Sequence, residues 1–381
     1  MDRRDFLAAF GAGAWVALSP GVALAQADRK QDWDRLLVLV ELKGGNDGLN
    51  TIVPHADDQY YVLRPKLALS REQTLPLSEA LGLNKAMAAV MPLWEHGQLA
   101  VVQGLGYPQP NLSHFRSIEI WDTASRSDEY LSSGWIARAL SRKPAPKEFT
   151  ADALVVGASD LGPVAGSRAI TLAGNFERNA RLANMGMGKA DGALSHILKV
   201  EADVAHAARS LGTTTSLKTE FPTHEFGRTC RTACETLARS TGVAAMRLSI
   251  GSFDTHDNQT NRHALLLTQL AEGLAALRSA LVEMGRWDES LVMTYAEFGR
   301  RPKENLSGGT DHGTVAPHFV MGGKVRGGLF GSTPSLNKLD ESGNLPWQVD
   351  FRQLYATVLE NWWGVPSAEL LGGRFNKLPI V

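Results

Sequence analysis

Residues 35–51 read RLLVLVELKGGNDGLNT, and this stretch decides the fold. Its first eight residues form a nearly unbroken apolar run, which is typical of a strand covered on both faces of a sheet. The run ends at Gly44-Gly45, and three glycines around Asp47 allow a tight turn at the strand tip. Asp47 is therefore either a functional carboxylate presented at that tip or a residue that caps the next segment.

Strands of this kind alternate with helical segments along the chain. We predict strands at 35–42, 99–103, 153–157, 243–250, 290–296 and 318–321, and helices at 85–96, 117–124, 193–209, 225–240, 258–283 and 351–363. This alternation predicts an α/β fold with a mainly parallel sheet and helices on both faces. We expect a single domain over residues 26–381, with a helical insertion at about 162–221.

The first 25 residues have the pattern of an export signal. Arg3-Arg4 precede an apolar run rich in alanine and glycine, and Ala23-Leu24-Ala25 offers small residues for cleavage. This pattern predicts a cleavable twin-arginine signal peptide. The alternative is a helix that remains as a membrane anchor, and the glycine and proline content argues against it. We therefore expect a periplasmic or secreted protein that uses the twin-arginine translocase and keeps no stable membrane span after cleavage.

Composition excludes several functional classes. The chain has 39 Lys and Arg against 40 Asp and Glu, so no basic excess is present to bind a nucleic acid backbone. Only two cysteines occur, Cys230 and Cys234, four residues apart in a predicted helix. Two cysteines are too few for a disulfide framework, a cysteine-rich zinc site or an iron–sulfur cluster. We interpret both as residues packed in the helix.

Chemistry-bearing residues gather at the ends of the predicted strands. They are Asp254 and His256 after 243–250, Glu297 and Arg300 after 290–296, and Asp311 and His312 before 318–321. Because ligands of open α/β sheets bind at the carboxyl ends of the strands, we expect these side chains to converge. Each motif alone also fits a turn cap, a solvated loop residue or a surface ion pair. His318 lies inside an apolar run and is interpreted as a packed residue.

Ser113-His114 follow a loop that contains two prolines. A hydroxyl at a helix start suits a nucleophile, since the helix N-terminus favours developing negative charge. The alternative is that Ser113 only caps the helix.

Carboxylates and imidazoles together form a borderline-hard ligand set. It fits one or two divalent ions of zinc, manganese, magnesium or calcium better than copper(I). Two metals with a serine nucleophile is an arrangement that serves displacement at phosphorus or sulfur.

Five motifs, taken in order, resemble one known family. They are GGNDGLNT (44–51), SHF (113–115), FDTH (253–256), EFGRR (297–301) and GTDHG (309–313). With the twin-arginine start, they are similar to the bacterial DUF1501 proteins over essentially the whole mature chain. That family is grouped with the alkaline-phosphatase-like and sulfatase-like superfamily. The resemblance implies an alkaline-phosphatase-like fold and leaves the reaction open.

The resemblance also implies roles for single residues. Asp47 matches the metal aspartate of the first strand, and Asp254 and His256 match an Asp–His pair on one metal. His312 matches the last histidine ligand, with Asp311 beside it. Ser113 lies near the place of the nucleophile. Glu297 is followed by Phe298 where the superfamily has Asp followed by His, so one imidazole ligand is missing. Neither cysteine lies in a Cys-x-Pro-x-Arg context, which excludes a formylglycine nucleophile.

Our leading hypothesis is an exported metal-assisted hydrolase of a phosphate or sulfate ester, on a small molecule, a glycan or a lipid head group. The expected metal ligands are Asp47, Asp254, His256, Glu297, Asp311 and His312. Ser113 would attack or orient the attacking water, His114 would move a proton or bind the substrate anion, and Arg300 would steady the leaving charge. The rival hypothesis is a catalytically degenerate binding protein that holds a glycan or an envelope partner in the same pocket. A metal-dependent transferase is a third possibility.

Overall fold

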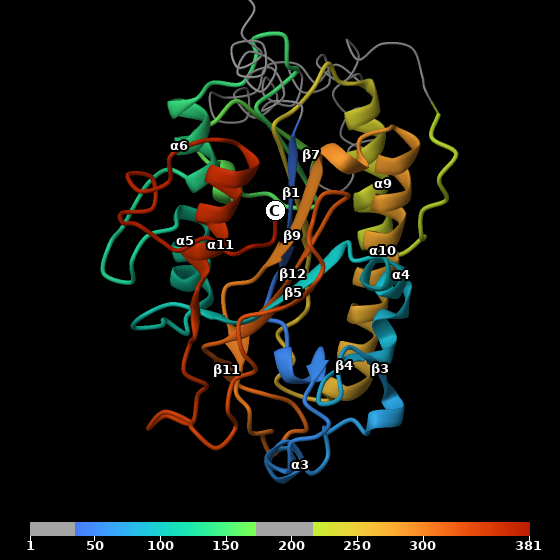
Figure 1. The fold of residues 1–381 in the computed structure, drawn as a ribbon, viewed down its shortest axis with the longest axis vertical. Helices are drawn as coiled ribbons and strands as arrows, with labels where there is room; N and C mark the ends of the chain where they lie inside the picture. The colour runs from blue at the N-terminus through green and yellow to red at the C-terminus, as the bar shows by residue number, and fades with distance from the viewer. Residues whose placement is uncertain (1–34, 173–215) are drawn as a thin grey trace, which may run out of the picture.

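The computed structural model describes residues 35–172 and 216–381 (Figure 1). The export signal predicted over residues 1–25 and the helix predicted over 193–209 lie outside these residues. So does most of the helical insertion predicted at 162–221, and within its described part residues Ala169–Leu172 form a strand.

A nine-stranded sheet runs through the described part of the chain, in the order β13-β5-β12-β9-β1-β8-β6-β7, with β14 paired to β5. Its strands are β1 (Leu36–Leu42), β5 (Leu99–Gly106), β6 (Ala153–Val156), β7 (Ala169–Leu172), β8 (Ala245–Ile250), β9 (Ser290–Tyr295), β12 (Ala316–Met321), β13 (Gly328–Phe330) and β14 (Val349–Asp350). The five strands from β9 to β7 are all parallel, and β12 is antiparallel to both of its neighbours. The predicted α/β class with a mainly parallel sheet is therefore confirmed.

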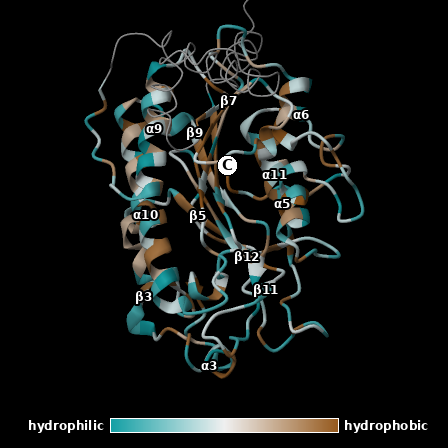
Figure 2. Ribbon diagram, turned by 180° about the vertical axis from the view of Figure 1, so that it is seen from behind, coloured by the Kyte–Doolittle hydropathy of each residue, from teal (hydrophilic) through white to brown (hydrophobic). Residues whose placement is uncertain are grey.

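Helices cover both faces of the sheet, as predicted (Figure 1). One layer consists of α9 (Glu225–Arg239), α10 (Gln259–Glu283), the 3₁₀ helix η3 (Lys85–Val90) and α4 (Met91–Glu95). The other layer consists of α5 (His114–Thr123), α6 (Trp135–Arg142) and α11 (Phe351–Thr357), which continues as a π-helical turn, Val358–Trp362. Figure 2 shows the apolar sheet between these two layers.

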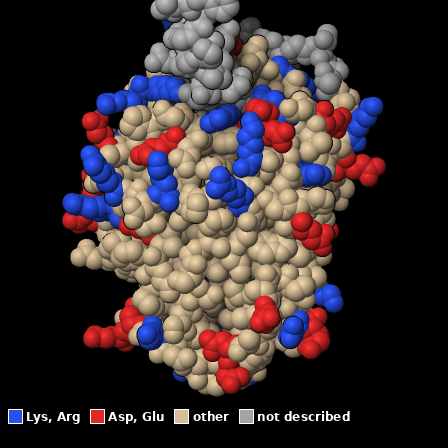
Figure 3. All heavy atoms as spheres, viewed as in Figure 1, with Lys and Arg blue, Asp and Glu red and all other residues tan. Residues whose placement is uncertain are grey.

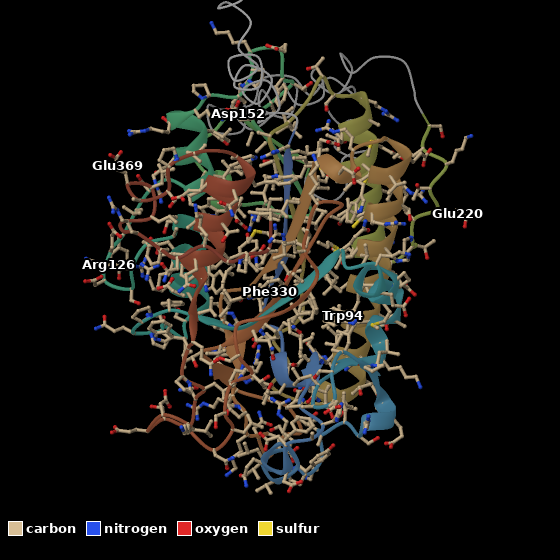
Figure 4. The ribbon with its side chains drawn as sticks, in the orientation of Figure 1. Trp94, Arg126, Asp152, Glu220, Phe330 and Glu369 are labelled. Atoms are coloured by element: carbon tan, nitrogen blue, oxygen red, sulfur yellow. The ribbon has the colours of Figure 1, made fainter. Side chains whose placement is uncertain are left out.

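Strand β1 is central because both of its faces are buried. Leu36, Val38, Val40 and Leu42 pack in the core beside α9 and α10, whereas Leu37 and Leu39 pack in the core beside α5, α6 and α11. This explains why its sequence shows no polar alternation. Side chains fill the space between sheet and helices, while the labelled Arg126, Glu220 and Glu369 lie at the periphery (Figure 4).

Short elements surround the carboxyl end of β1. They are β2 (Ile52–Val53), α3 (Asp58–Leu63), β3 (Thr74–Pro76), β4 (Gly82–Asn84), β10 (Gly299–Arg300), β11 (His312–Gly313) and 3₁₀ turns at Gly48–Asn50 and Arg71–Gln73. Strands β2, β4 and β3 form a separate small sheet, and β10 pairs with β11. These elements occupy the lower end of the molecule in Figure 1. Two 3₁₀ turns lie elsewhere: Gly162–Val164 packs against α5 and α6, and Trp287–Glu289 leads into the amino end of β9.

Within the described residues, helix α10 has the length and composition of a membrane span. It packs against α9 and η3, and 56% of its most apolar window is buried, as is usual for a core helix. Cys230 and Cys234 are free thiols buried in α9, in agreement with their interpretation as packed residues. Positive and negative side chains are interspersed on the face seen in Figure 3, and its middle is largely uncharged.

His318 lies in β12 and is buried, which confirms that it is a packed residue. Its ring meets Trp121 edge-on, and its Nδ1 lies 3.3 Å from the Thr294 hydroxyl. Burial lowers the pKa of His318 from 6.5 to about 3, so the folded chain holds it neutral where the unfolded chain binds a proton.

We expect this histidine to make stability depend on pH. Its stabilising contribution is complete above pH 6.5 and is lost as the pH falls toward 3, with a slope of up to about 1.4 kcal/mol per pH unit. His318→Leu should reduce the slope of unfolding free energy against pH between 6.5 and 4, measured by urea denaturation. The exposed His96, changed to Gln, is the control and should leave the slope unchanged. Equal slopes for His318→Leu and the natural chain would contradict the assignment.

Candidate functional site

The candidate site lies where the carboxyl ends of β1, β8 and β9 meet. Because β12 is antiparallel, its amino end lies at the same edge, so the loop before it joins the site. The close approach of β1 to the loop after β8 requires glycine at position 44. Gly44 has φ +112°, and a Cβ there would lie 2.4 Å from the backbone nitrogen of Asp254.

Three side chains bring one ligand atom each to a common point. Nε2 of His256 lies 3.1 Å from Oδ1 of Asp254 and 3.0 Å from Nε2 of His312. Nε2 of His312 lies 3.2 Å from the same Asp254 oxygen. The three atoms therefore form a nearly equilateral triangle. Ligand atoms that share a tetrahedral zinc ion at about 2.0–2.1 Å lie about 3.3 Å apart, which is close to this spacing.

Hydrogen bonds at the far side of each ring fix where the lone pairs point. His312 Nδ1 lies 2.9 Å from the carbonyl oxygen of Leu112, which can only accept, so Nδ1 carries the proton. His256 Nδ1 lies 3.2 Å from a carboxylate oxygen of Asp311, to which it donates in the same way. In their neutral forms both rings thus present an unprotonated Nε2 to Asp254.

His114, the first residue of α5, approaches the same carboxylate from the other side. Its Nε2 lies 3.4 Å from Oδ2 of Asp254, and its Nδ1 lies 2.8 Å from Oε1 of Glu297. One ligand atom each from His114, Asp254 and His312 lie within 4.8 Å of one another. Three imidazoles and one carboxylate therefore face one small volume.

Glu297 lies behind His114. Its Oε1 also accepts the backbone N–H of Gly44 at 2.9 Å, so one carboxylate oxygen binds both the tip of β1 and the imidazole. The other oxygen, Oε2, is buried without a hydrogen-bond partner among the described residues. The structure thus places Glu297 one layer outside the imidazole nitrogens, where it orients His114.

Asp311 also lies outside the triangle. Its Oδ1 contacts Nδ1 of His256 and Nδ2 of Asn305, both at 3.2 Å. Hydrogen bonding from Asn305 lowers the pKa of Asp311, so the carboxylate is ionised and can orient the imidazole.

Electrostatics keep the centre ready to bind a cation. Burial alone would raise the pKa of Asp254, but the hydrogen bond and charge of Arg300 outweigh this effect and lower it to about 2. Burial also lowers the pKa of His312, so that its ring is neutral at pH 7. The result is an ionised carboxylate beside imidazole lone pairs.

Arg300 is 2% exposed, and its guanidinium is used within the protein. Nε donates to the Gly45 carbonyl at 2.8 Å and Nη1 donates to the Thr310 carbonyl at 2.8 Å. Nη2 donates to the Gly44 carbonyl and to Asp254. Arg300 therefore positions Asp254 and connects the loops, and each of its three guanidinium nitrogens already donates within the protein.

Asp47 lies apart from the histidines. Its two carboxylate oxygens accept from Arg64 at 2.6 and 2.9 Å, and Gln259 of α10 donates to one of them. Both members of the ion pair are fully buried. Burial raises the pKa of Asp47, but the charge and hydrogen bonds of Arg64 outweigh this effect and lower it. The structure therefore gives Asp47 the role of anchoring the glycine-rich loop.

Ser113 caps α5 by position only, since its side chain makes no capping hydrogen bond. It is exposed and lies between two residues that contact the cluster, Leu112 and His114. Phe115 follows and is 88% exposed, and Leu306 is fully exposed in the loop that carries Asn305. Two apolar side chains thus lie one residue away from groups that support the cluster.

Sequence reasoning did not identify some of the supporting groups. The Leu112 carbonyl has no side-chain signal, and Arg64 is not part of any motif. Their roles depend on contacts between distant segments: His312 lies 200 residues from Leu112. The sequence also does not show that Glu297 lies behind His114, because the spacing of motifs along the chain does not give distances in space.

Comparisons with known proteins agree with the motif resemblance. The family described as "Protein of unknown function (DUF1501)" matches residues 34–371. No curated protein matches the chain.

Several solved structures are similar in general fold. The lipoteichoic acid synthase LtaP from Listeria monocytogenes has 10% identity, with 90% of this chain and 75% of that chain covered and a TM-score of 0.42. A protein in the alkaline phosphatase superfamily from Vibrio parahaemolyticus has 10% identity, 89% and 69% coverage, and a TM-score of 0.42. The phosphonate monoester hydrolase SpPMH from Silicibacter pomeroyi has 9% identity, 90% and 76% coverage, and a TM-score of 0.40. At these scores none of the similarities carries a conclusion about the site.

The buried ion pair makes a testable prediction about the glycine-rich loop. Arg64→Met should lower the free energy of unfolding by about 3–5 kcal/mol, because it leaves the Asp47 carboxylate buried and unpaired. Arg262→Met is the control, since it breaks an exposed ion pair with Asp257 and should cost little. Urea denaturation at pH 7 measures both. Similar small losses for the two variants would contradict the anchoring role.

Proposed function

The chain belongs to the DUF1501 family, and from the geometry of its histidine cluster we propose that it is an exported, metal-assisted hydrolase of a phosphate or sulfate ester. One observation carries the proposal. Three imidazole Nε2 atoms and the Asp254 carboxylate face one volume, and each ring is oriented by an acceptor at its Nδ1.

Such an arrangement favours a bound cation. The two Nε2 atoms lie 3.0 Å apart beside the Asp254 carboxylate, and where both carry lone pairs a positive charge between them would relieve their repulsion. Histidines oriented through Nδ1 by carbonyl or carboxylate oxygens are typical of metal sites. The residues therefore fit a divalent metal, which Asp254, His256 and His312 would hold.

The donor set narrows the choice of metal. Two imidazole nitrogens and one carboxylate oxygen suit zinc or manganese better than magnesium or calcium, which prefer oxygen ligands. Glu297 and Asp311 support the set by orienting His114 and His256. We assign one ion to this set and leave Asp47 in its ion pair with Arg64.

The remaining side chains supply proton transfer and a nucleophile. A bound divalent ion would provide Lewis-acid polarisation of the ester and charge neutralisation. His114 accepts at Nε2 the proton of the attacking hydroxyl, while the hydroxyl oxygen bonds to phosphorus or sulfur and the bond to the leaving ester oxygen breaks. Glu297 at Nδ1 stabilises the resulting imidazolium, which returns the proton to the leaving oxygen. Ser113, adjacent in sequence at the start of α5, provides that hydroxyl or orients the attacking water.

The surroundings favour a substrate with an apolar part. Phe115 and Leu306 are exposed and directly follow His114 and Asn305 in the sequence, and an apolar contact with them would remove their surface from water. A lipid head group ester offers such a part, as does an ester with an aromatic leaving group.

One observation favours the rival function. Arg300 and Glu297, which were expected to act on substrate and metal, are instead buried in supporting positions. A binding protein that holds a glycan or an envelope partner would need neither. Metal content and turnover separate the two functions.

The ligand set predicts different effects for two histidines. The natural chain should bind about one equivalent of zinc, and His312→Ala should abolish binding because two protein ligands remain. His114→Gln should retain zinc but lose on the order of 10²–10⁴ in kcat, because a proton acceptor is lost. Mass-spectrometric metal analysis and a screen of phosphate and sulfate esters measure these effects, with the exposed His96→Ala as control.

Two outcomes would contradict the proposal. Full zinc occupancy in the His312→Ala variant would remove the metal assignment. Zinc binding by the natural chain, without turnover of any phosphate or sulfate ester, would favour the binding protein.

We also propose that residues 1–25 direct twin-arginine export and are removed. Arg3-Arg4, the apolar run and Ala23-Leu24-Ala25 support this. Amino-terminal sequencing of periplasmic protein should begin at Gln26, and Arg3→Lys with Arg4→Lys should leave the precursor in the cytoplasm. Arg29→Lys, beyond the cleavage site, is the control. Normal export of the double variant would contradict the twin-arginine route.

A further inference from the structure

A phosphate or sulfate ester brings negative charge to the site, and the arginine expected to meet it is already occupied. Arg300 is buried, and its Nε, Nη1 and Nη2 donate to the carbonyls of Gly45, Thr310 and Gly44 and to Asp254. Arg64 is likewise committed to Asp47. Any side-chain cation that binds the oxyanion beside the proposed metal is therefore a different one.

Lys43 is the residue at the tip of β1, and backbone bonds fix its place. Its N–H donates to the Ile250 carbonyl at 2.9 Å, and its carbonyl accepts from the Phe253 N–H at 3.1 Å. The sheet pairing of β1 with the segment after β8 thus continues through Lys43. Asp254 follows Phe253 directly, so Lys43 lies beside the residue that leads into the histidine cluster.

The pleat of β1 determines which face Lys43 shares. Leu37 and Leu39 pack in the core beside α5, and Glu41 contacts Arg247, which in turn contacts Tyr295 on the same face. The Tyr295 hydroxyl donates to Asp122 of α5. Since alternate residues of a strand point to the same face, Lys43 projects on the side of α5.

That face also carries His114, the first residue of α5, and the two positions are linked through one carboxylate. Glu297 Oε1 accepts both from His114 Nδ1 and from the backbone N–H of Gly44, the residue after Lys43. The Lys43 side chain is exposed, and none of the ion pairs among residues 35–172 and 216–381 includes it. Its ammonium group is thus available to a ligand.

From this placement we propose that Lys43 is the anion-binding residue of the site, and that it selects tetrahedral oxyanion esters by holding their non-bridging oxygens. The inference rests on the proposed function for its substrate class. A flexible four-carbon stem with a compact ammonium suits this task, because it presents a point charge without fixing one planar geometry.

The test measures binding of inorganic phosphate and inorganic sulfate by calorimetry, with the full mature chain both zinc-loaded and treated with chelator. Lys43→Met should weaken binding by about tenfold or more, because a charge-assisted hydrogen bond is lost. Lys43→Arg should retain most of the affinity. Lys85→Met is the matched control, since Lys85 is also exposed but begins η3 in the other helical layer. Zinc content should be the same in all variants.

The outcomes separate this inference from the proposed function. Unchanged phosphate and sulfate affinity in Lys43→Met would overturn the role of Lys43, as would absence of any binding by the natural chain, while zinc binding and turnover would stand. Loss of phosphate and sulfate affinity in Lys43→Met but not in Lys85→Met would support the role of Lys43. The same result would support that role even if the natural chain binds no zinc. In that last case the hydrolase proposal fails and the anion site remains.

Discussion

One buried guanidinium holds the site together. Arg300 donates to carbonyl oxygens of the β1 tip, at Gly44 and Gly45, and of the loop before β11, at Thr310, and it also binds Asp254 after β8. The β1 tip lies more than 200 residues before the other two segments in the sequence, and without this group the carbonyls that it binds would lose these hydrogen bonds. A buried charge of this kind is stable only when its hydrogen bonds are satisfied, so the loops and the arginine depend on each other.

The consequence of this clamp is an oriented set of imidazoles. Once Asp254 is fixed, His256 and His312 meet its carboxylate, while Asp311 and the Leu112 carbonyl hold the far sides of the two rings. His114 enters from α5 with Glu297 behind it. The imidazole Nε2 atoms face the shared volume, and oxygen acceptors lie at the Nδ1 atoms on the far sides of the rings. These acceptors determine where the Nε2 lone pairs point.

Most of the fold could be predicted from the sequence, because strand and helix periodicities are local. The convergence of Asp254, His256 and His312 could also be predicted, since each is next to a strand end. The sequence could not predict which carboxylates face the volume shared by the imidazoles and which lie behind the imidazole rings. Asp47 and Asp254 both follow strands, yet only a structure shows that Asp47 is fully buried in an ion pair with Arg64, 17 residues further along, whereas Asp254 contacts the histidines. Strand β7 and the antiparallel direction of β12 depend on pairing between distant segments, which the sequence pattern does not specify.

The central claim is that Asp254, His256 and His312 bind one metal ion. Anomalous diffraction at the zinc absorption edge, from crystals of the mature chain grown with zinc, tests it directly. The account predicts one strong peak within about 2.0–2.2 Å of His256 Nε2, His312 Nε2 and an oxygen of Asp254. A peak beside Asp47, or no peak between these three residues at full zinc saturation, would contradict it.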